Sequence, residues 1–297
     1  MKILVTGAEG QLARSLVEAA GGTEITVAAL GRPSLDITMP DPIAAHMREV
    51  VPDLVVNAAA YTAVDKAESE PDLAHSVNAL GAGHVAAACR KASIPIIHIS
   101  TDYVFDGNKQ APYVESDDTA PAGAYGRSKL DGEINVQAQQ PQHIILRTAW
   151  VHSPFGNNFV KTMLRLAETR PELGVVDDQL GTPTYAPHLA TAILDISRLI
   201  ATRARDDMPW GIYHAAGQGE VTWCGLARAT LARAAALGAN PVKVNAITTA
   251  DYPTPARRPA NSRLDCSKLK KQLGISLPEW RLGVEECVAR LMASKSG

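Results

Sequence analysis

A tyrosine and a lysine four residues apart, Tyr125 and Lys129, form the pair in this sequence that is best suited to acid–base chemistry. On a helix, this spacing places both side chains on one face. A phenol alone ionises near pH ~10, but a neighbouring ammonium group favours the phenolate and lowers the pKa of the phenol. The pair can then exchange a proton with a carbonyl or alcohol oxygen near neutral pH. Because the same spacing also occurs on solvated helix faces, its meaning depends on the segments around it.

Polar side chains follow an apolar run upstream of this pair. The run at residues 94–99 predicts a strand, and Thr101 and Asp102 come at its C-terminal end. A hydroxyl at a strand tip, followed by tyrosine and lysine on the next helix, is typical of a site that reduces carbonyl groups. We expect Thr101 to hydrogen-bond the substrate oxygen and Tyr125 to donate the proton. Lys129 then tunes Tyr125 and holds the nicotinamide ribose.

A glycine-rich turn near the N-terminus predicts where a dinucleotide binds. Residues 2–6 are expected to form a buried strand, and a helix with an apolar period follows the turn. Gly7 permits the tight turn, and Gly10 lets the backbone approach a pyrophosphate, which the helix N-terminus favours electrostatically. The third position of the G-x-x-G-x-x-G spacing is Ala13, which is small enough for the helix to pack closely on the strand. The position of the turn after a first strand favours dinucleotide binding over a simple turn.

The end of the second expected strand, residues 24–30, carries the residues that would select the cofactor. Arg32 can pair with a 2′-phosphate, whereas an acid there would bond a ribose 2′-hydroxyl. The sequence therefore favours NADPH, with NADH as the alternative and a solvated surface arginine as the other interpretation. Asp36 either caps the next helix or turn, or frames the adenine together with Ile37.

The third expected strand, residues 53–57, ends in small residues. They let a cofactor lie against the backbone at the edge where open α/β sheets bind ligands, although core alanines would give the same pattern. The residues expected at this part of the cofactor site are Ala58, Ala59, Ala60, Tyr61 and Thr62.

Strands and helices alternate through the first half of the chain, which predicts an α/β fold with a doubly wound, mostly parallel, Rossmann-like sheet. Fourth and fifth strands are expected at residues 94–99 and 143–147, and one long helix at residues 72–91 despite Asn78 in its middle. The loop at residues 106–124 is long enough to be functional or mobile. We predict a dinucleotide-binding domain at residues 1–150 that carries the Tyr/Lys site. Residues 151–297 are expected to form a smaller α/β lobe that mainly binds substrate and can return segments to the main sheet.

The composition argues against several classes of function. The chain has 297 residues and a formal net charge of -2 with both signs interspersed, which does not favour nucleic acid or a membrane surface as a partner. Four scattered cysteines and the absence of histidine clusters predict neither a disulfide framework nor a metal site. We find no signal peptide and no apolar span of membrane length in the sequence, and we expect a cytoplasmic protein.

The segments around these residues resemble the extended short-chain dehydrogenase/reductases, and within them the dTDP-4-dehydrorhamnose reductase family. The resemblance covers nearly the whole chain, and several matching segments lie outside the cofactor fold. The matching segments are residues 6–7, 10–12, 35–38, 57–60, 63–68, 100–107, 147–150, 178–179, 181–184, 258–259 and 261–262.

The resemblance implies an NAD(P)H-dependent reduction at C4 of dTDP-4-dehydro-L-rhamnose, giving dTDP-L-rhamnose. The cofactor contacts that it implies are Gly10, Gln11, Leu12, Asp36, Ile37, Ala60, Tyr61 and Thr62. The sugar-nucleotide contacts that it implies are Thr101, Asp102 and Trp150, and Tyr103 in the same segment is placed with them.

The types of two side chains indicate how they would bind the substrate. Trp150 offers a flat apolar face to the deoxysugar, unless it is a core tryptophan. Arg257 or Arg258 can clamp the substrate diphosphate bidentately, unless the arginine beside the proline is structural. The chain departs from the family at Ala13, where glycine is usual, and at Tyr61, where histidine is common. In some members, glutamates hold a metal between two subunits, and we find no match for these glutamates here. The sequence therefore does not decide whether the protein forms a homodimer or binds a metal in it.

Two other functions fit parts of the pattern. A nucleotide-sugar epimerase or dehydratase of the same fold would hold NAD tightly and return the hydride. A non-catalytic, NADP-binding regulatory subunit would not need the set Thr101, Tyr125 and Lys129.

Overall fold

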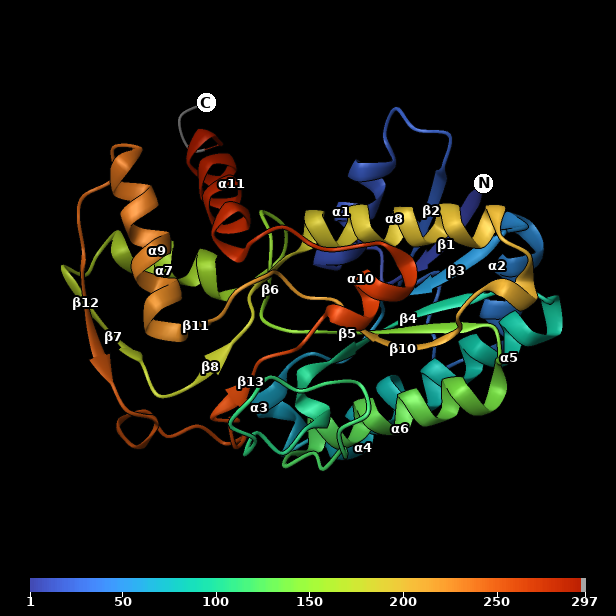
Figure 1. Ribbon diagram of the computed structural model, residues 1–297, viewed down its shortest axis with the longest axis horizontal. Helices are drawn as coiled ribbons and strands as arrows, with labels where there is room; N and C mark the ends of the chain where they lie inside the picture. The colour runs from blue at the N-terminus through green and yellow to red at the C-terminus, as the bar shows by residue number, and fades with distance from the viewer. Residues whose placement is uncertain (295–297) are drawn as a thin grey trace.

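One six-stranded parallel sheet forms the centre of the computed structural model, which describes residues 1–294 (Figure 1). Its strand order is β10-β5-β4-β3-β1-β2, and all neighbouring strands pair in parallel. The strands are β1 (Lys2–Thr6), β2 (Thr26–Leu30), β3 (Leu54–Asn57), β4 (Ile96–Thr101), β5 (His143–Thr148) and β10 (Gly211–His214). The predicted doubly wound α/β fold is confirmed. Residues 295–297 of the predicted second lobe lie outside the described residues.

Helices cover both faces of this sheet, which explains why its strands are nearly continuous apolar runs. On one face lie α1 (Gln11–Ala20) and α8 (Ala186–Thr202), and on the other α2 (Pro40–Val50), α5 (Ala82–Ala92) and α6 (Ala124–Gln139) (Figure 1). Leu16 and Leu189 are fully buried on the first face, as are Val85 and Val136 on the second. Two separate apolar layers therefore clamp the sheet.

The strand order reverses between β1 and β3, and this reversal opens a crevice at the carboxyl ends of the strands. β1 and β3 approach closely there: Thr6 Oγ1 donates to Asn57 Oδ1 at 2.6 Å. Gly7 has a φ of +79°, and a Cβ on it would lie 2.9 Å from the Ala59 Cα. A residue with a side chain would be strained here and would push the two strand tips apart.

The remaining elements form a smaller lobe with its own apolar cluster, on the left of Figure 1. Its helices are α7 (Phe159–Ala167), α9 (Trp223–Ala236) and α11 (Trp280–Ala293). Its strands are β7 (Glu172–Val176), β8 (Leu180–Gly181), β11 (Val221–Thr222), β12 (Lys243–Ile247) and β13 (Asn261–Ser262). The short pair β6 (Val151–His152) and β9 (Thr184–Tyr185) lies between the two parts, and α10 (Ser267–Leu273) packs at β10.

The long helix predicted at residues 72–91 is present as a continuous helical run, but it contains a π-helical turn that was not predicted. The segment divides into α4 (Pro71–His75), a π-helical turn (Ser76–Gly81) and α5. The amide of Asn78 in this turn bonds the backbone N–H of Tyr61 at 2.8 Å, the Tyr61 carbonyl at 3.0 Å and Ser128 Oγ at 3.0 Å. These tertiary bonds give a physical reason for the wider turn, since π turns inside helices often mark functional regions.

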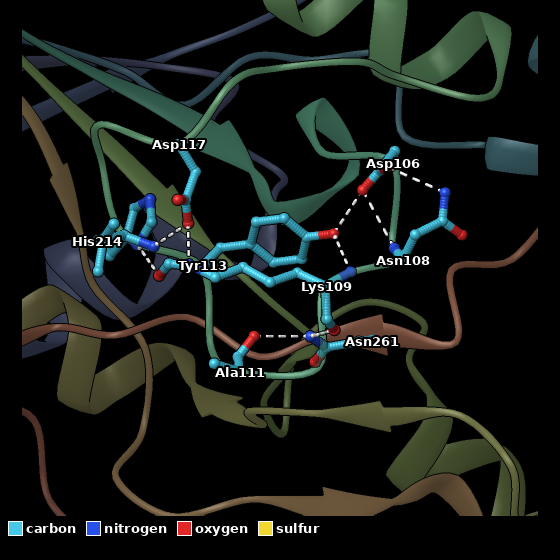
Figure 2. Close-up of polar contacts among 9 residues, drawn as sticks. Asp106, Asn108, Lys109, Ala111, Tyr113, Asp117, His214 and Asn261 are labelled. Carbon is cyan, nitrogen blue, oxygen red and sulfur yellow. Dashed lines mark hydrogen bonds and ion pairs between the residues drawn. The ribbon is translucent and has the colours of Figure 1, made fainter.

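The loop between β4 and α6 is held by its own polar network (Figure 2). It begins with a 3₁₀ turn (Asp102–Val104). Tyr113 donates its hydroxyl proton to Asp106 Oδ1 at 2.5 Å, and its carbonyl bonds the His214 ring at 3.0 Å. Asn261 donates to the carbonyls of Lys109 and Ala111 at 2.6 and 2.9 Å. These contacts tie the loop that connects β4 and α6 to β10 and β13.

Candidate functional site

A cavity of about 850 Å³ opens at the carboxyl ends of β1, β3 and β4. Most of the residues predicted for the cofactor and the substrate line it. These are Gly7, Gly10, Gln11, Leu12, Arg32, Asp36, Ile37, Ala58, Ala59, Ala60, Thr62, Thr101, Asp102, Tyr103, Tyr125, Lys129 and Trp150. The cavity is large enough for a cofactor together with part of a substrate.

The N-terminus of α1 points its free backbone N–H groups at one end of this cavity. Gly10, the N-cap residue, provides no side-chain cap, and its own N–H donates to the Gly7 carbonyl at 2.8 Å. The N–H groups of the first turn are therefore available to an anion, and the helix dipole favours negative charge there. The backbone fits the pyrophosphate of a dinucleotide.

Arg32 and Asp36 line the part of the cavity that follows β2. The Arg32 side chain is exposed and makes no hydrogen bond or ion pair with residues 1–294, so its guanidinium is free to bind a phosphate. Asp36 Oδ1 accepts from the Thr38 N–H at 2.9 Å and from Thr38 Oγ1 at 2.8 Å. These two bonds lower the pKa of Asp36, with a smaller contribution from Arg32. Asp36 thus stabilises the turn, the first of its two interpretations, while it lines the cavity beside Ile37.

Thr101, Tyr125 and Lys129 converge on the middle of the cavity. Thr101 is the last residue of β4, and the other two lie on the buried face of α6. Lys129 Nζ donates to the Ile99 carbonyl at 2.6 Å. Burial lowers the pKa of Lys129 to about 8, and the Glu133 carboxylate opposes this effect. Lys129 therefore stays mainly protonated at neutral pH.

The expected lowering of the pKa of Tyr125 by Lys129 is not observed. Burial raises the pKa of Tyr125, the charge of Asp102 adds to this, and the hydroxyl of Thr101 opposes it. The physical reason is that an apolar surrounding disfavours the phenolate more than its neighbours stabilise it. Tyr125 is consequently a neutral phenol that holds its proton, which is the form that a proton donor requires.

The position of α6 depends on two contacts near its N-terminus. A Cβ on Gly126 would lie 2.2 Å from the Tyr103 carbonyl oxygen, so only glycine allows the helix to approach this close. Glu68, just after α3 (Val64–Ala67), accepts the N–H of Ala124 at 2.8 Å and caps the helix. A carboxylate at this end also interacts favourably with the helix dipole. Both contacts act within two residues of Tyr125.

Asp102 is a buried carboxyl group at the substrate end. Its Oδ1 accepts from Thr101 Oγ1 at 3.0 Å, whereas its Oδ2 has no hydrogen-bond partner among the described residues. Burial raises its pKa to about 7, against the opposing bond from Thr101. The neighbouring Tyr103 packs edge-on against Tyr125, with ring centroids 5.5 Å apart. An unpartnered oxygen that lines a cavity is suited to a substrate hydroxyl.

Trp150 forms the wall between the sheet and the smaller lobe. Its backbone has a φ of +47°, which is uncommon for a bulky residue. The indole stacks on Trp223 with centroids 3.5 Å apart, and its Nε1 donates to Ser262 Oγ at 3.0 Å. Trp223 covers one face of the indole, Gly181 packs so close to the ring that a Cβ there would lie 2.3 Å from it, and Trp150 also lines the cavity.

Three predicted site residues do not line the cavity. Tyr61 donates its hydroxyl proton to Glu70 at 2.5 Å, and this bond raises its pKa to about 12. Arg258 donates to Asp65 Oδ2 at 2.7 Å and to Tyr103 Oη at 2.9 Å. Arg257 is exposed to solvent. The diphosphate clamp by Arg257 or Arg258 therefore stays a prediction, with both side chains outside the cavity lining.

The sequence did not single out the segment after β6, although it lines the cavity. Asn158 Nδ2 and Ser153 Oγ both donate to Gln11 Oε1 at 2.9 Å, which ties this segment to the start of α1. Asn158 also caps α7 by accepting the N–H of Lys161 at 3.1 Å. The Gly156-Asn157-Asn158 run is a turn signal that could have been noticed, but its partner Gln11 is 142 or more residues away.

A cavity at the switch point of a Rossmann-like sheet, with tyrosine and lysine one helical turn apart inside it, places the protein among the extended short-chain dehydrogenase/reductases. A family model described as the RmlD substrate binding domain matches residues 1–293. The chain belongs to this family.

Known proteins support this assignment. The dTDP-4-dehydrorhamnose reductase of Sinorhizobium fredii is 47 % identical over 292 residues, which are 98 % of this chain and 97 % of that protein. A crystal structure of a dTDP-4-dehydrorhamnose reductase from Clostridium acetobutylicum has a TM-score of 0.90 at 40 % identity and covers 98 % of this chain and 99 % of that one. The Bacillus anthracis dTDP-4-dehydrorhamnose reductase, crystallised in complex with NADP, has a TM-score of 0.90 at 35 % identity, covering 97 % and 99 %. The resemblance predicted from the sequence is confirmed.

Two findings concern what the structure lacks. Across residues 1–294, every helix is too short or too polar to span a lipid bilayer. In the same residues, no three His, Cys, Asp or Glu side chains are grouped so that they could hold a metal ion.

Proposed function

We propose that this protein reduces the C4 ketone of dTDP-4-dehydro-L-rhamnose to give dTDP-L-rhamnose, with NADPH as the hydride donor. The observation that carries the proposal is the meeting of Thr101, Tyr125 and Lys129 in the same cavity as the free N-terminus of α1. The family, and relatives at up to 47 % identity that bear this enzyme's name, support it.

Tyr125 supplies the proton in this reaction. A dinucleotide held at the N-terminus of α1 would supply the hydride for C4, and the ketone oxygen would then need one proton. The buried, neutral Tyr125 transfers its phenolic proton to that oxygen, and its phenolate is then adjacent to the Lys129 ammonium group. Thr101 now donates its hydroxyl proton to Asp102 Oδ1; in the proposal this hydroxyl turns to donate to the ketone oxygen instead and orients the ketone.

The sugar and its diphosphate lie between Asp102, Tyr103 and Trp150 in this proposal. The free Oδ2 of Asp102 accepts from a sugar hydroxyl, and the open surface of Trp150 packs on the deoxysugar. Arg258 is committed to Asp65 and Tyr103, so Arg257 is the arginine with a free guanidinium for the diphosphate. We assign the diphosphate contact to Arg257. Arg258 can make this contact only if its bonds to Asp65 and Tyr103 break.

NADPH is the preferred cofactor in the proposal, with NADH as a slower alternative. Arg32 supports this preference because its unpaired guanidinium stands where a 2′-phosphate would lie. We assign cofactor binding to residues 1–150 and mainly substrate binding to residues 151–297. The four free cysteines, of which three are buried, support a reducing compartment such as the cytoplasm.

An initial-rate assay with dTDP-4-dehydro-L-rhamnose tests the proposal, with NADPH and NADH offered in turn. We expect one NADPH to be oxidised per dTDP-L-rhamnose formed. An epimerase or dehydratase would instead retain its cofactor through purification without net oxidation, and a regulatory subunit would bind NADPH without turnover. Either of these results would overturn the proposal.

A further inference from the structure

A buried ion pair lies directly behind the proposed proton-transfer residues. Arg147 donates from Nε to Glu133 Oε1 at 2.9 Å and from Nη2 to Oε2 at 2.7 Å, and the two side chains are only 3 % and 1 % exposed. Ser100 Oγ donates a third bond to Glu133 Oε1 at 2.5 Å. Three donors thus satisfy a carboxylate that burial would otherwise strongly destabilise.

Two members of this cluster adjoin proposed catalytic residues, and the third is paired with both. Ser100 directly precedes Thr101 on β4, and Arg147 on β5 is its cross-strand neighbour. Glu133 follows Lys129 by four residues on α6, so the two side chains lie on one face of the helix. A change of charge in the cluster is therefore felt at Lys129.

Two acceptors, the Ile99 carbonyl and the Glu133 carboxylate, lie near the ammonium group of Lys129. Its Nζ donates to the neutral Ile99 carbonyl, while the nearby Glu133 carboxylate is occupied by Arg147 and Ser100. The charge of Glu133 still raises the pKa of Lys129, against the larger lowering by burial. Glu133 thus helps to keep the buried ammonium protonated without holding it.

Few other charges surround Lys129. The charge that acts on Lys129 is that of Glu133 on α6, and Lys129 in turn acts on His98 on β4. Tyr125 and Asp102 line the same cavity, and Arg147 on β5 is paired with Glu133. Burial and the charge of Lys129 hold the pKa of His98 far below its usual range, so His98 is neutral. The adjoining π-helical turn contributes the amide of Asn78 and no charged group.

We propose that Arg147 and Glu133 are positioning residues that set the charge and the placement of Lys129. Arg147 neutralises Glu133, so the carboxylate does not capture the ammonium group, which stays free to turn toward Tyr125 and the cofactor ribose. Glu133 in turn keeps that ammonium protonated in a buried place. The inference rests on the role proposed for Lys129.

The pH dependence of kcat/KM tests this inference, because its alkaline limb reports the loss of the Lys129 proton in the free enzyme. Glu133→Gln removes the charge that raises the pKa of Lys129 and leaves Arg147 unpaired, so the limb moves to lower pH by about one unit. In Arg147→Met, Glu133 loses its ion-pair partner and its charge acts more strongly on Lys129. The alkaline limb therefore moves to higher pH by about one unit, and kcat falls. The double variant returns the limb to within a few tenths of a unit of the parent's.

Opposite shifts distinguish this role from a merely structural one, which would move neither limb in a folded variant. Shifts in the same direction, or an unmoved limb in both folded single variants, would overturn the inference. If Glu133→Gln does not fold by circular dichroism, Arg147→Met alone is compared with the parent. If Arg147→Met does not fold, Ser100→Ala replaces it, because it also weakens the hold on Glu133 and leaves no buried charge unpaired. Its limb should rise by a few tenths of a unit, and an unmoved limb would refute the inference. Activity of the parent enzyme on the keto sugar separates this failure from a failure of the proposed function.

Discussion

Tyr125 holds its proton in this site because burial disfavours the phenolate more than its neighbours support it. Burial and the charge of Asp102 raise its pKa, and the Thr101 hydroxyl lowers it only in part. The sequence predicted the residues but not this balance, since a spacing of four on a helix contains no information about desolvation. Reduction of a ketone needs a donor that carries its proton at the start, so the neutral phenol agrees with the proposed direction of the reaction.

Replacing Tyr125 by phenylalanine removes the proton donor and leaves the ring. We expect the turnover number to fall by about 10²–10⁴-fold, because a positioned acid supplies a rate factor of that size. Binding of NADPH, measured by fluorescence titration, should change little. Tyr252→Phe is the matched control, since Tyr252 is 61 % exposed and does not line the cavity. Turnover of Tyr125→Phe within tenfold of the parent would remove this residue from the proton-transfer step.

Asp102→Asn tests the buried carboxyl group through the pH dependence of stability. The pKa of Asp102 is raised from 3.8 to about 7, so the folded protein binds its proton more tightly than the unfolded chain. The free energy of unfolding of the parent relative to Asp102→Asn should therefore fall as pH rises from about 4 to 7 and level off above 7. The total fall has an upper bound of roughly 4 kcal/mol.

Urea unfolding of both proteins at several pH values measures this difference. The exposed Asp118→Asn variant removes the same charge outside the core and serves as the control. A difference between parent and Asp102→Asn that does not change between pH 4 and 7 would contradict the raised pKa.

Arg32→Ala tests how the cofactor is selected. We expect the KM for NADPH to rise by roughly 10–100-fold through the loss of a charge-assisted contact with the 2′-phosphate, while the KM for NADH stays nearly constant. Initial rates with each cofactor measure this, and Arg48→Ala on α2, which is exposed and outside the cavity, is the control. Equal losses with both cofactors would show that Arg32 does not read the phosphate.

At the level of elements, the helix that carries Tyr125 is positioned by contacts that its own sequence does not reveal. The apolar period of α6 is weak, and its place is set by the close approach of Gly126 to Tyr103 and by the cap from Glu68. The helix itself could be predicted from the Tyr–Lys spacing. The contacts could not, because each joins it to a segment more than twenty residues away.

Gly126→Ala tests that close approach. The new Cβ would lie 2.2 Å from the Tyr103 carbonyl oxygen and 2.9 Å from Pro121 Cβ, so α6 must shift outward. We expect a loss of about 1–3 kcal/mol in the free energy of unfolding and a fall in kcat larger than the change in KM for NADPH. Gly83→Ala on α5 is the control, because its Cβ meets only the Asn135 side chain, at 3.3 Å. A Gly126→Ala enzyme with the stability and kcat of the parent would show that α6 tolerates displacement.

Strands were predicted more accurately than the turns between elements. β1 and β5 match their expected ranges to within a residue, because buried parallel strands are short apolar runs with clear ends. The division of the segment at residues 72–91 was missed, because the bonds of Asn78 to Tyr61 and Ser128 form only after folding. The local sequence sets the secondary-structure preference of a segment, and contacts with distant residues can override that preference.

At the level of the whole molecule, the two halves of the sequence are interleaved around the cavity. α8 and β10, from the second half, complete one face and one edge of the main sheet. Trp150 and the segment up to Asn158 join the sheet to the smaller lobe and line the cavity at the same time. The doubly wound sheet was predictable from alternation, and the sequence analysis allowed later segments to return to it. Which segments return required the three-dimensional structure, since a strand of four residues does not indicate which sheet it joins.

The central claim is that hydride from the nicotinamide reaches C4 of the sugar beside Tyr125. NADPH that carries deuterium at the transferring C4 position tests it directly, with the product analysed by proton NMR. We predict one deuterium at C4 of dTDP-L-rhamnose for each NADPH oxidised by the parent enzyme. A product without deuterium at C4, or label that returns to the cofactor, would contradict the account.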